Sequence, residues 1–91
     1  MSKINVRQLT DEEKEKMQVE SWGVWKKEVS IFPWSYDTKE QCYIIEGSAV
    51  VTDSETGEEA EFGAGDFVEF LPGLKCEWNI KEDIKKYYRF V

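Results

Sequence analysis

Histidine is absent from all 91 residues of the chain. Its imidazole is the usual acid or base near neutral pH and the commonest metal ligand in proteins. The absence excludes a metal site built on imidazoles and any catalysis that depends on a histidine. Chemistry in this protein must therefore use carboxylates, thiols, tyrosines or lysines.

Positive charge is also scarce. Twelve Lys and Arg residues stand against 19 Asp and Glu residues, which gives a net charge of −7. The only adjacent basic pairs are Lys26-Lys27 and Lys85-Lys86. Nucleic acids and anionic membranes are recognised by basic surfaces, so neither is expected as a partner.

Long apolar runs and export signals are missing as well. No run reaches the roughly 18 apolar residues of a membrane-spanning helix, and Met1 to Asn5 contain no apolar signal-peptide core. We therefore expect a cytoplasmic protein. In that compartment Cys42 and Cys76 are expected to be free thiols and not a disulfide.

The chain is long enough for one domain with a modest core, because 41% of its residues are hydrophobic. We expect a single domain over residues 1–91, made of an N-terminal extension (1–20) and a β-barrel (21–91). So small a core predicts marginal stability, or stability that is shared with a second copy in a homodimer.

One short helix is predicted in the extension. Thr10 and Glu13 form a capping box, and good helix formers continue to about Glu20. Beyond Trp22 the pattern changes to short runs of β-branched and aromatic residues separated by turn signals. The candidate strands are Lys27–Phe32, Glu40–Glu46, Ser48–Asp53, Glu58–Phe62, Asp66–Leu71, Lys75–Ile80 and Ile84–Val91.

These spacings predict an all-β fold, because the connections suit hairpins and are too short for crossover helices. An antiparallel barrel or sandwich follows, with the helix outside. Alternation along the strands places Glu40 and Cys42 on one face. On a later strand, alternation places four apolar residues on one face that is expected to face the core, namely Leu74, Cys76, Trp78 and Ile80.

The spacing of the chain resembles the cupins, a family of double-stranded β-helix (jelly-roll) barrels. Trp34-Ser35-Tyr36 stands where the first cupin motif has His-x-His, three residues precede Glu40, and six separate Glu40 from Gly47. In the second motif Gly65 and Gly73 keep their places, whereas Cys76 replaces the histidine and Ile80 the asparagine. The spacing of both motifs is kept, whereas their histidine ligands are replaced by other residues.

Several segments resemble the small single-domain cupins that are similar to the cupin domain of (S)-ureidoglycine aminohydrolase. This resemblance covers about residues 20–91 and implies a barrel that is frequently dimeric. The segments are Trp22–Trp25, Phe32–Tyr36, Glu40–Gly47, Phe62–Asp66, Leu74–Trp78 and Ile84–Phe90.

Four residues correspond to the cupin metal ligands, namely Trp34, Tyr36, Glu40 and Cys76. Only Glu40 and Cys76 are good donors, so the usual manganese or iron site is excluded. Because Cys42 projects beside Glu40, the set Glu40, Cys42 and Cys76 could hold zinc with an open position. The alternative is that both thiols are small buried hydrophobic groups.

The aromatic residues Trp34, Tyr36, Tyr43 and Trp78 either fill the core or line a ligand pocket. Glu40 among them is the best candidate for a general acid or base; otherwise it makes a structural hydrogen bond. Lys85, Lys86 and Arg89 are expected at a solvated strand edge, or else at a pocket rim that attracts anions.

Three functional hypotheses follow. The first is a metal-free barrel that binds a small organic molecule through Trp34, Tyr36, Glu40, Cys42, Cys76 and Trp78. The second is an enzyme similar to the aminohydrolase, acting on a small ureido or amino metabolite, with Glu40 as acid or base and zinc or manganese on Cys42 and Cys76. The third is a purely structural dimeric barrel that pairs through the chain from Trp22 and the apolar edge at Val29 and Ile31.

Overall fold

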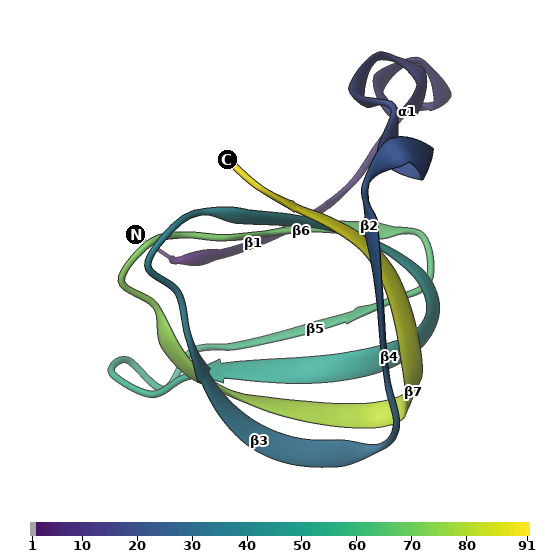
Figure 1. The fold of residues 1–91 in the computed structure, drawn as a ribbon. Helices are drawn as coiled ribbons and strands as arrows, with labels where there is room; N and C mark the ends of the chain where they lie inside the picture. The colour runs from purple at the N-terminus through teal and green to yellow at the C-terminus, as the bar shows by residue number, and fades with distance from the viewer. Residues whose placement is uncertain (1) are drawn as a thin grey trace.

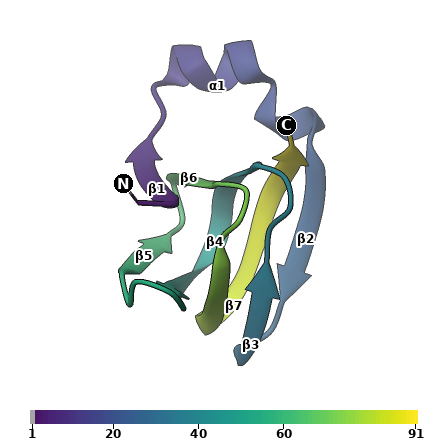
Figure 2. The ribbon, with the colours of Figure 1, turned by 90° about the vertical axis from the view of Figure 1, so that its left-hand side faces the viewer.

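The computed structural model describes residues 2–91 and is dominated by antiparallel strands. Its elements are β1 (Ile4–Gln8), α1 (Asp11–Met17), a 3-10 turn η1 (Val19–Ser21), β2 (Gly23–Lys27), β3 (Ser30–Ser35), β4 (Glu40–Asp53), β5 (Glu59–Gly63), β6 (Asp66–Phe70) and β7 (Lys75–Phe90). The strands curl around one interior, and α1 lies outside them (Figure 1, Figure 2). The predicted all-β jelly-roll barrel with one short helix is confirmed.

Two long strands hold the barrel together. The sheet runs in the order β1-β6-β4-β7-β2, while β5 adds to the far part of β4 and β3 adds to the first part of β7. Each long strand therefore serves both sides of the barrel, as Figure 1 shows for β4 and β7. The turn signals at Gly47 and at Lys81-Glu82-Asp83 predict two separate strands in place of each of them. Those turn signals mark bends inside continuous strands.

The side chains of β4 that face inward are at even-numbered positions before its bend and at odd-numbered positions after it. Before it Glu40, Cys42 and Ile44 are buried, and after it Ala49 and Val51 are buried. The register against β7 shifts three times between Ile44 and Ala49, so that five steps along β4 match six along β7 and the parity of β4 changes. On β7 the predicted core stripe is confirmed, since Leu74, just before the strand, and Cys76, Trp78 and Ile80 are all buried.

The N-terminal region differs from its prediction. β1 was not expected, yet it pairs with β6 from Ile4 to Gln8 and ties the extension to the barrel. The capping box is present, with Thr10 Oγ1 accepting from the Glu13 N–H at 3.1 Å. The helix ends at Met17 and not near Glu20, because Gln18 adopts a left-handed backbone conformation with φ of +52°.

The predicted strand Lys27–Phe32 is wrong, since β2 ends at Lys27 and β3 begins at Ser30. The Asp83 carboxylate accepts the backbone N–H of Val29 at 3.0 Å in the connection between them. Val29 and Ile31, the expected dimer edge, are both more than half exposed. No helix among residues 2–91 is long and apolar enough to cross a membrane.

A glycine substitution tests the bend in β4. Gly47 has φ of +86°, and an added Cβ would clash with the Asp83 carbonyl oxygen. We expect Gly47→Ala to lower the free energy of unfolding by about 2 to 5 kcal/mol, through left-handed strain plus overpacking. Gly57 has φ of +79° and nothing within 4 Å of its added Cβ. Gly57→Ala should therefore cost only about 1 to 2 kcal/mol, and equal losses in chemical denaturation would contradict the role of Gly47.

Candidate functional site

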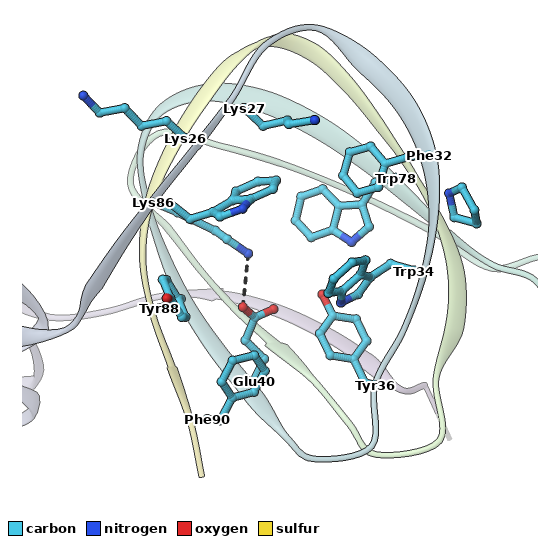
Figure 3. A pocket seen from close by; sticks show the side chains of 12 residues that line it. Lys26, Lys27, Phe32, Trp34, Tyr36, Glu40, Trp78, Lys86, Tyr88 and Phe90 are labelled. Carbon is cyan, nitrogen blue, oxygen red and sulfur yellow. Dashed lines mark hydrogen bonds and ion pairs between the residues drawn. The ribbon is translucent and has the colours of Figure 1, made fainter.

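A pocket of about 680 Å³ opens at one end of the barrel. Its lining residues come from β2, from β3 and the residue after it, and from both parts of β7, and Glu40 enters from the start of β4. Its lining is mainly aromatic and consists of Trp25, Lys26, Lys27, Phe32, Pro33, Trp34, Tyr36, Glu40, Trp78, Lys86, Tyr88 and Phe90 (Figure 3). The volume suits one small organic molecule.

An ion pair lies at the floor of this pocket. Lys86 Nζ is 3.2 Å from Glu40 Oε2, and both residues are at most 5% exposed. The same ammonium contacts Cys42 Sγ at 3.3 Å. Figure 3 shows the Lys86 side chain reaching from the wall towards the Glu40 carboxylate. A buried charge of either sign is costly alone, so each of these two residues requires the other.

Two indole rings flank the Lys86 ammonium. The Nζ atom lies 4.8 Å from the ring centroids of both Trp25 and Trp78. This distance permits cation–π attraction to each ring, and that attraction is stronger where water is excluded. The rings, the carboxylate and the thiol together surround a cation that belongs to the chain itself.

Glu40 keeps one oxygen free. Its Oε1 atom is buried and has no hydrogen-bond partner among residues 2–91. The structural hydrogen bond that was considered for Glu40, to Tyr36, a Trp N–H or the backbone, is replaced by the ion pair with Lys86. Figure 3 shows the Tyr36 hydroxyl on the side of the pocket to which this free oxygen points.

Tyr36 is held by backbone and ring contacts. Its N–H donates to Leu74 O at 2.9 Å, and its carbonyl accepts from the Gly73 N–H at 2.8 Å. Its ring stacks on Phe70 with 5.0 Å between centroids. Burial and then the negative charge of Glu40 raise the pKa of the Tyr36 hydroxyl well above its usual range. The hydroxyl therefore stays protonated and can donate a hydrogen bond.

The two thiols lie outside the pocket. Cys42 is fully buried beneath Lys86, and Cys76 is buried with its Sγ 3.5 Å from the Trp34 carbonyl oxygen. Both are free, as expected. Burial raises the pKa of Cys42 to about 12, although Lys86 opposes the shift, and burial raises the pKa of Cys76 to about 11. Their assignment to the ligand-binding set is therefore not supported by the pocket lining, which omits them.

The expected pocket residues divide into two groups. Trp34, Tyr36, Glu40 and Trp78 are brought together in one lining, with Trp34 at the rim and 55% exposed. Among residues 2–91 no group of three or more His, Cys, Asp or Glu side chains is arranged to hold a metal ion. Glu40, Cys42 and Cys76 are thus not gathered as a ligand set, and Lys86 lies between Glu40 and Cys42.

Lys86 is the functional residue that sequence reasoning misplaced. It was expected at a solvated strand edge or a rim, yet it is 4% exposed. Strand alternation could have found it, because Lys86 is in phase with the buried Ile84 and with Tyr88, which lines the pocket. Arg89 is at neither a solvated strand edge nor the pocket rim: it is half-buried on a strand that pairs with both β2 and β4, its guanidinium lies 4.4 Å from the Trp22 ring centroid, and its Nε donates to Gln41.

The antiparallel barrel with a pocket at one end defines a small cupin. The family model of the EutQ-like cupin domain matches residues 14–88, so the chain belongs to this family. A search of the curated proteins found no match. The similarity to (S)-ureidoglycine aminohydrolase stays a prediction.

Solved structures agree with this assignment. A DUF861 family protein from Thermotoga maritima is 40% identical with a TM-score of 0.94, over 97% of this chain and 99% of that one. The putative ethanolamine utilization protein Q of Salmonella typhimurium shares the fold at 22% identity and a TM-score of 0.67, over 96% of this chain and 68% of that one. The EutQ protein of Clostridium difficile shares it at 18% identity and a TM-score of 0.68, over 96% and 66%.

Charge removal tests the ion pair at the floor. Lys86→Met leaves the Glu40 carboxylate buried and unpaired, so we expect a loss of about 3 to 5 kcal/mol in the free energy of unfolding. The double variant Glu40→Leu/Lys86→Met removes both charges and should recover most of that loss. Urea denaturation measures both effects, with the exposed Lys81→Met as control, expected within about 0.5 kcal/mol of the parent. A double variant no more stable than Lys86→Met would contradict the pairing.

Because both thiols have raised pKa values in the folded chain, the stability of the fold should decrease in alkaline solution. Their pKa values in the folded chain, about 12 for Cys42 and about 11 for Cys76, lie above the ordinary value of 9.0. The unfolded chain thus releases these protons first, and stability falls as the pH rises from about 9 towards these values. Cys42→Ala/Cys76→Ala should flatten that decline in urea midpoints measured against pH. An unchanged slope would indicate that other groups cause it.

Proposed function

We propose that this cupin is a binding module that holds one small, uncharged or anionic organic molecule in its aromatic pocket without a metal ion. The observation that carries the proposal is the Lys86 ammonium, which occupies the polar floor between Glu40, Cys42 and two indole rings. A cation bound there would have to displace a charge that the chain already supplies.

The charge of the lining supports the same ligand class. Three lysines (Lys26, Lys27 and Lys86) and one carboxylate (Glu40) line the pocket, so 3 − 1 gives +2. The chain as a whole carries −7. Aromatic cages usually recognise cations, but this one is already occupied by its own ammonium and has two further lysines beside it. Neutral and anionic ligands are therefore favoured over cations.

The aromatic walls favour a flat ligand. Phe32 and Trp78 lie nearly parallel, with 6.1 Å between centroids and 6° between planes. Trp25 meets both rings at steep angles and continues the apolar surface. Such rings offer faces and edges to a planar molecule, and Trp34 is available at the mouth to cover it.

The enzymatic alternative has less support. Zinc on Cys42 and Cys76 requires thiolates, whereas burial raises the pKa of both thiols. Lys86 also competes for Glu40. A purely structural barrel is also less favoured, because a closed core would need neither an open aromatic pocket nor an unpaired carboxylate oxygen.

Metal content separates the binding module from the metalloenzyme. Protein purified without a histidine tag or a chelator should contain far less than one zinc or manganese ion per chain by elemental mass spectrometry. One metal ion per chain that is lost in both Glu40→Gln and Cys76→Ser would reverse the preference in favour of the aminohydrolase-like enzyme.

Ligand binding is tested by thermal shift with small planar acids and neutral aromatic compounds. A ligand at about one hundred times its Kd should stabilise the fold by about 2.7 kcal/mol. In a chain of this size the Tm should then rise by several degrees. Trp34→Ala should weaken the shift, whereas Ile31→Ala should not, because Ile31 is exposed on the same strand but outside the pocket lining. Equal shifts in both variants would place the binding elsewhere.

A further inference from the structure

The floor of the pocket has one unused acceptor beside a donor group with spare capacity. Glu40 is 5% exposed, and its Oε1 has no hydrogen-bond partner among residues 2–91. The Lys86 ammonium has three N–H groups, and within the described chain its two hydrogen-bond acceptors are Glu40 Oε2 and Cys42 Sγ. A complementary ligand therefore needs both a donor and an acceptor.

Simple charged groups match only half of this pattern. A carboxylate offers acceptors alone, so at the floor it would face the Glu40 carboxylate with no proton to share. An ammonium offers donors alone and would face Lys86. Buried polar groups that remain unpaired cost binding free energy, so a ligand that satisfies both partners is selected over either of these.

We propose that the floor recognises a neutral carboxamide-type group, a primary amide or a lactam, attached to a flat apolar body. Its N–H donates to Glu40 Oε1, and its carbonyl oxygen accepts from Lys86 Nζ. The apolar body then lies against the wall that Trp25, Phe32 and Trp78 form; Figure 3 shows Phe32 and Trp78 side by side in this wall. This inference rests on the proposed function, because it specifies which molecule the metal-free pocket binds.

Tyr36 adds a second polar group at this point. Its hydroxyl lies on the side to which Glu40 Oε1 points (Figure 3). A planar amide that enters there can bond the carboxylate with one N–H. In a primary amide the second N–H remains available, and the hydroxyl oxygen can accept it.

Four matched probes test the pattern by calorimetry and by shifts of the indole N–H signals in NMR. Benzamide carries donor and acceptor, acetophenone and N,N-dimethylbenzamide carry the acceptor alone, and benzoate carries acceptors with a charge. We expect benzamide to bind about tenfold more tightly than each of the other three, the change that corresponds to one hydrogen bond of about 1.4 kcal/mol. Equal affinities for benzamide and acetophenone would overturn the proposal.

Two variants test whether Glu40 and Lys86 produce the preference for benzamide over acetophenone. Glu40→Leu/Lys86→Met removes the acceptor and the donor together and should bind benzamide no better than acetophenone. Lys81→Met, an exposed change outside the pocket lining, should keep the tenfold preference. A preference that survives in the double variant would show that the floor does not produce it.

The outcomes also separate this inference from the proposed function. If none of the four probes binds while other flat aromatic compounds raise the Tm, the carboxamide assignment fails and the binding module stands. If no small molecule binds under any condition, both fail together.

Discussion

The buried pair of Lys86 and Glu40 is the interaction on which the rest of the site depends. Its two charges lie 3.2 Å apart at the floor of a largely apolar pocket, where neither is stable alone. Two indole rings face the ammonium, and a protonated thiol lies beneath it. The pair therefore supplies a fixed cation inside the barrel and leaves one buried carboxylate oxygen without a hydrogen-bond partner among residues 2–91.

The architecture explains how two residues 46 positions apart in the sequence come to meet there. β4 and β7 run side by side along most of their length, and each bends so that it belongs to both sides of the barrel. Glu40 begins β4, and Lys86 lies in the second part of β7, beyond its bend. Gly47 allows the bend in β4, because its backbone passes too close to Asp83 for any side chain. A change of parity at either bend would turn these side chains away from each other.

Membership of the EutQ-like cupin domain family accounts for the barrel but leaves its contents to this chain's own residues. The spacing around Glu40 and Gly47 is that of a cupin, and the fold agrees with the Thermotoga maritima protein over nearly the whole chain. Two of the four residues at the cupin ligand positions are aromatic, Trp34 and Tyr36, and a lysine from another part of the barrel provides the positive charge. The cupin fold therefore does not determine which residues line the pocket.

Sequence patterns determined much of this protein. Alternation identified the core stripe from Leu74 to Ile80, and the capping box located the helix start. Motif spacing placed Trp34, Tyr36 and Glu40 in one site, although its fourth member, Cys76, lies outside the pocket lining. These features are local, because each depends on neighbours within one strand, turn or motif.

Only the tertiary structure decided the rest. β1 joins the sheet through partners more than 55 residues away, and the turn signals at Gly47 and Lys81 became bends because long-range pairing continues across them. Lys86 was misplaced for the same reason. A charged residue is expected outside unless a distant partner compensates for its burial, and here that partner is Glu40 on another strand.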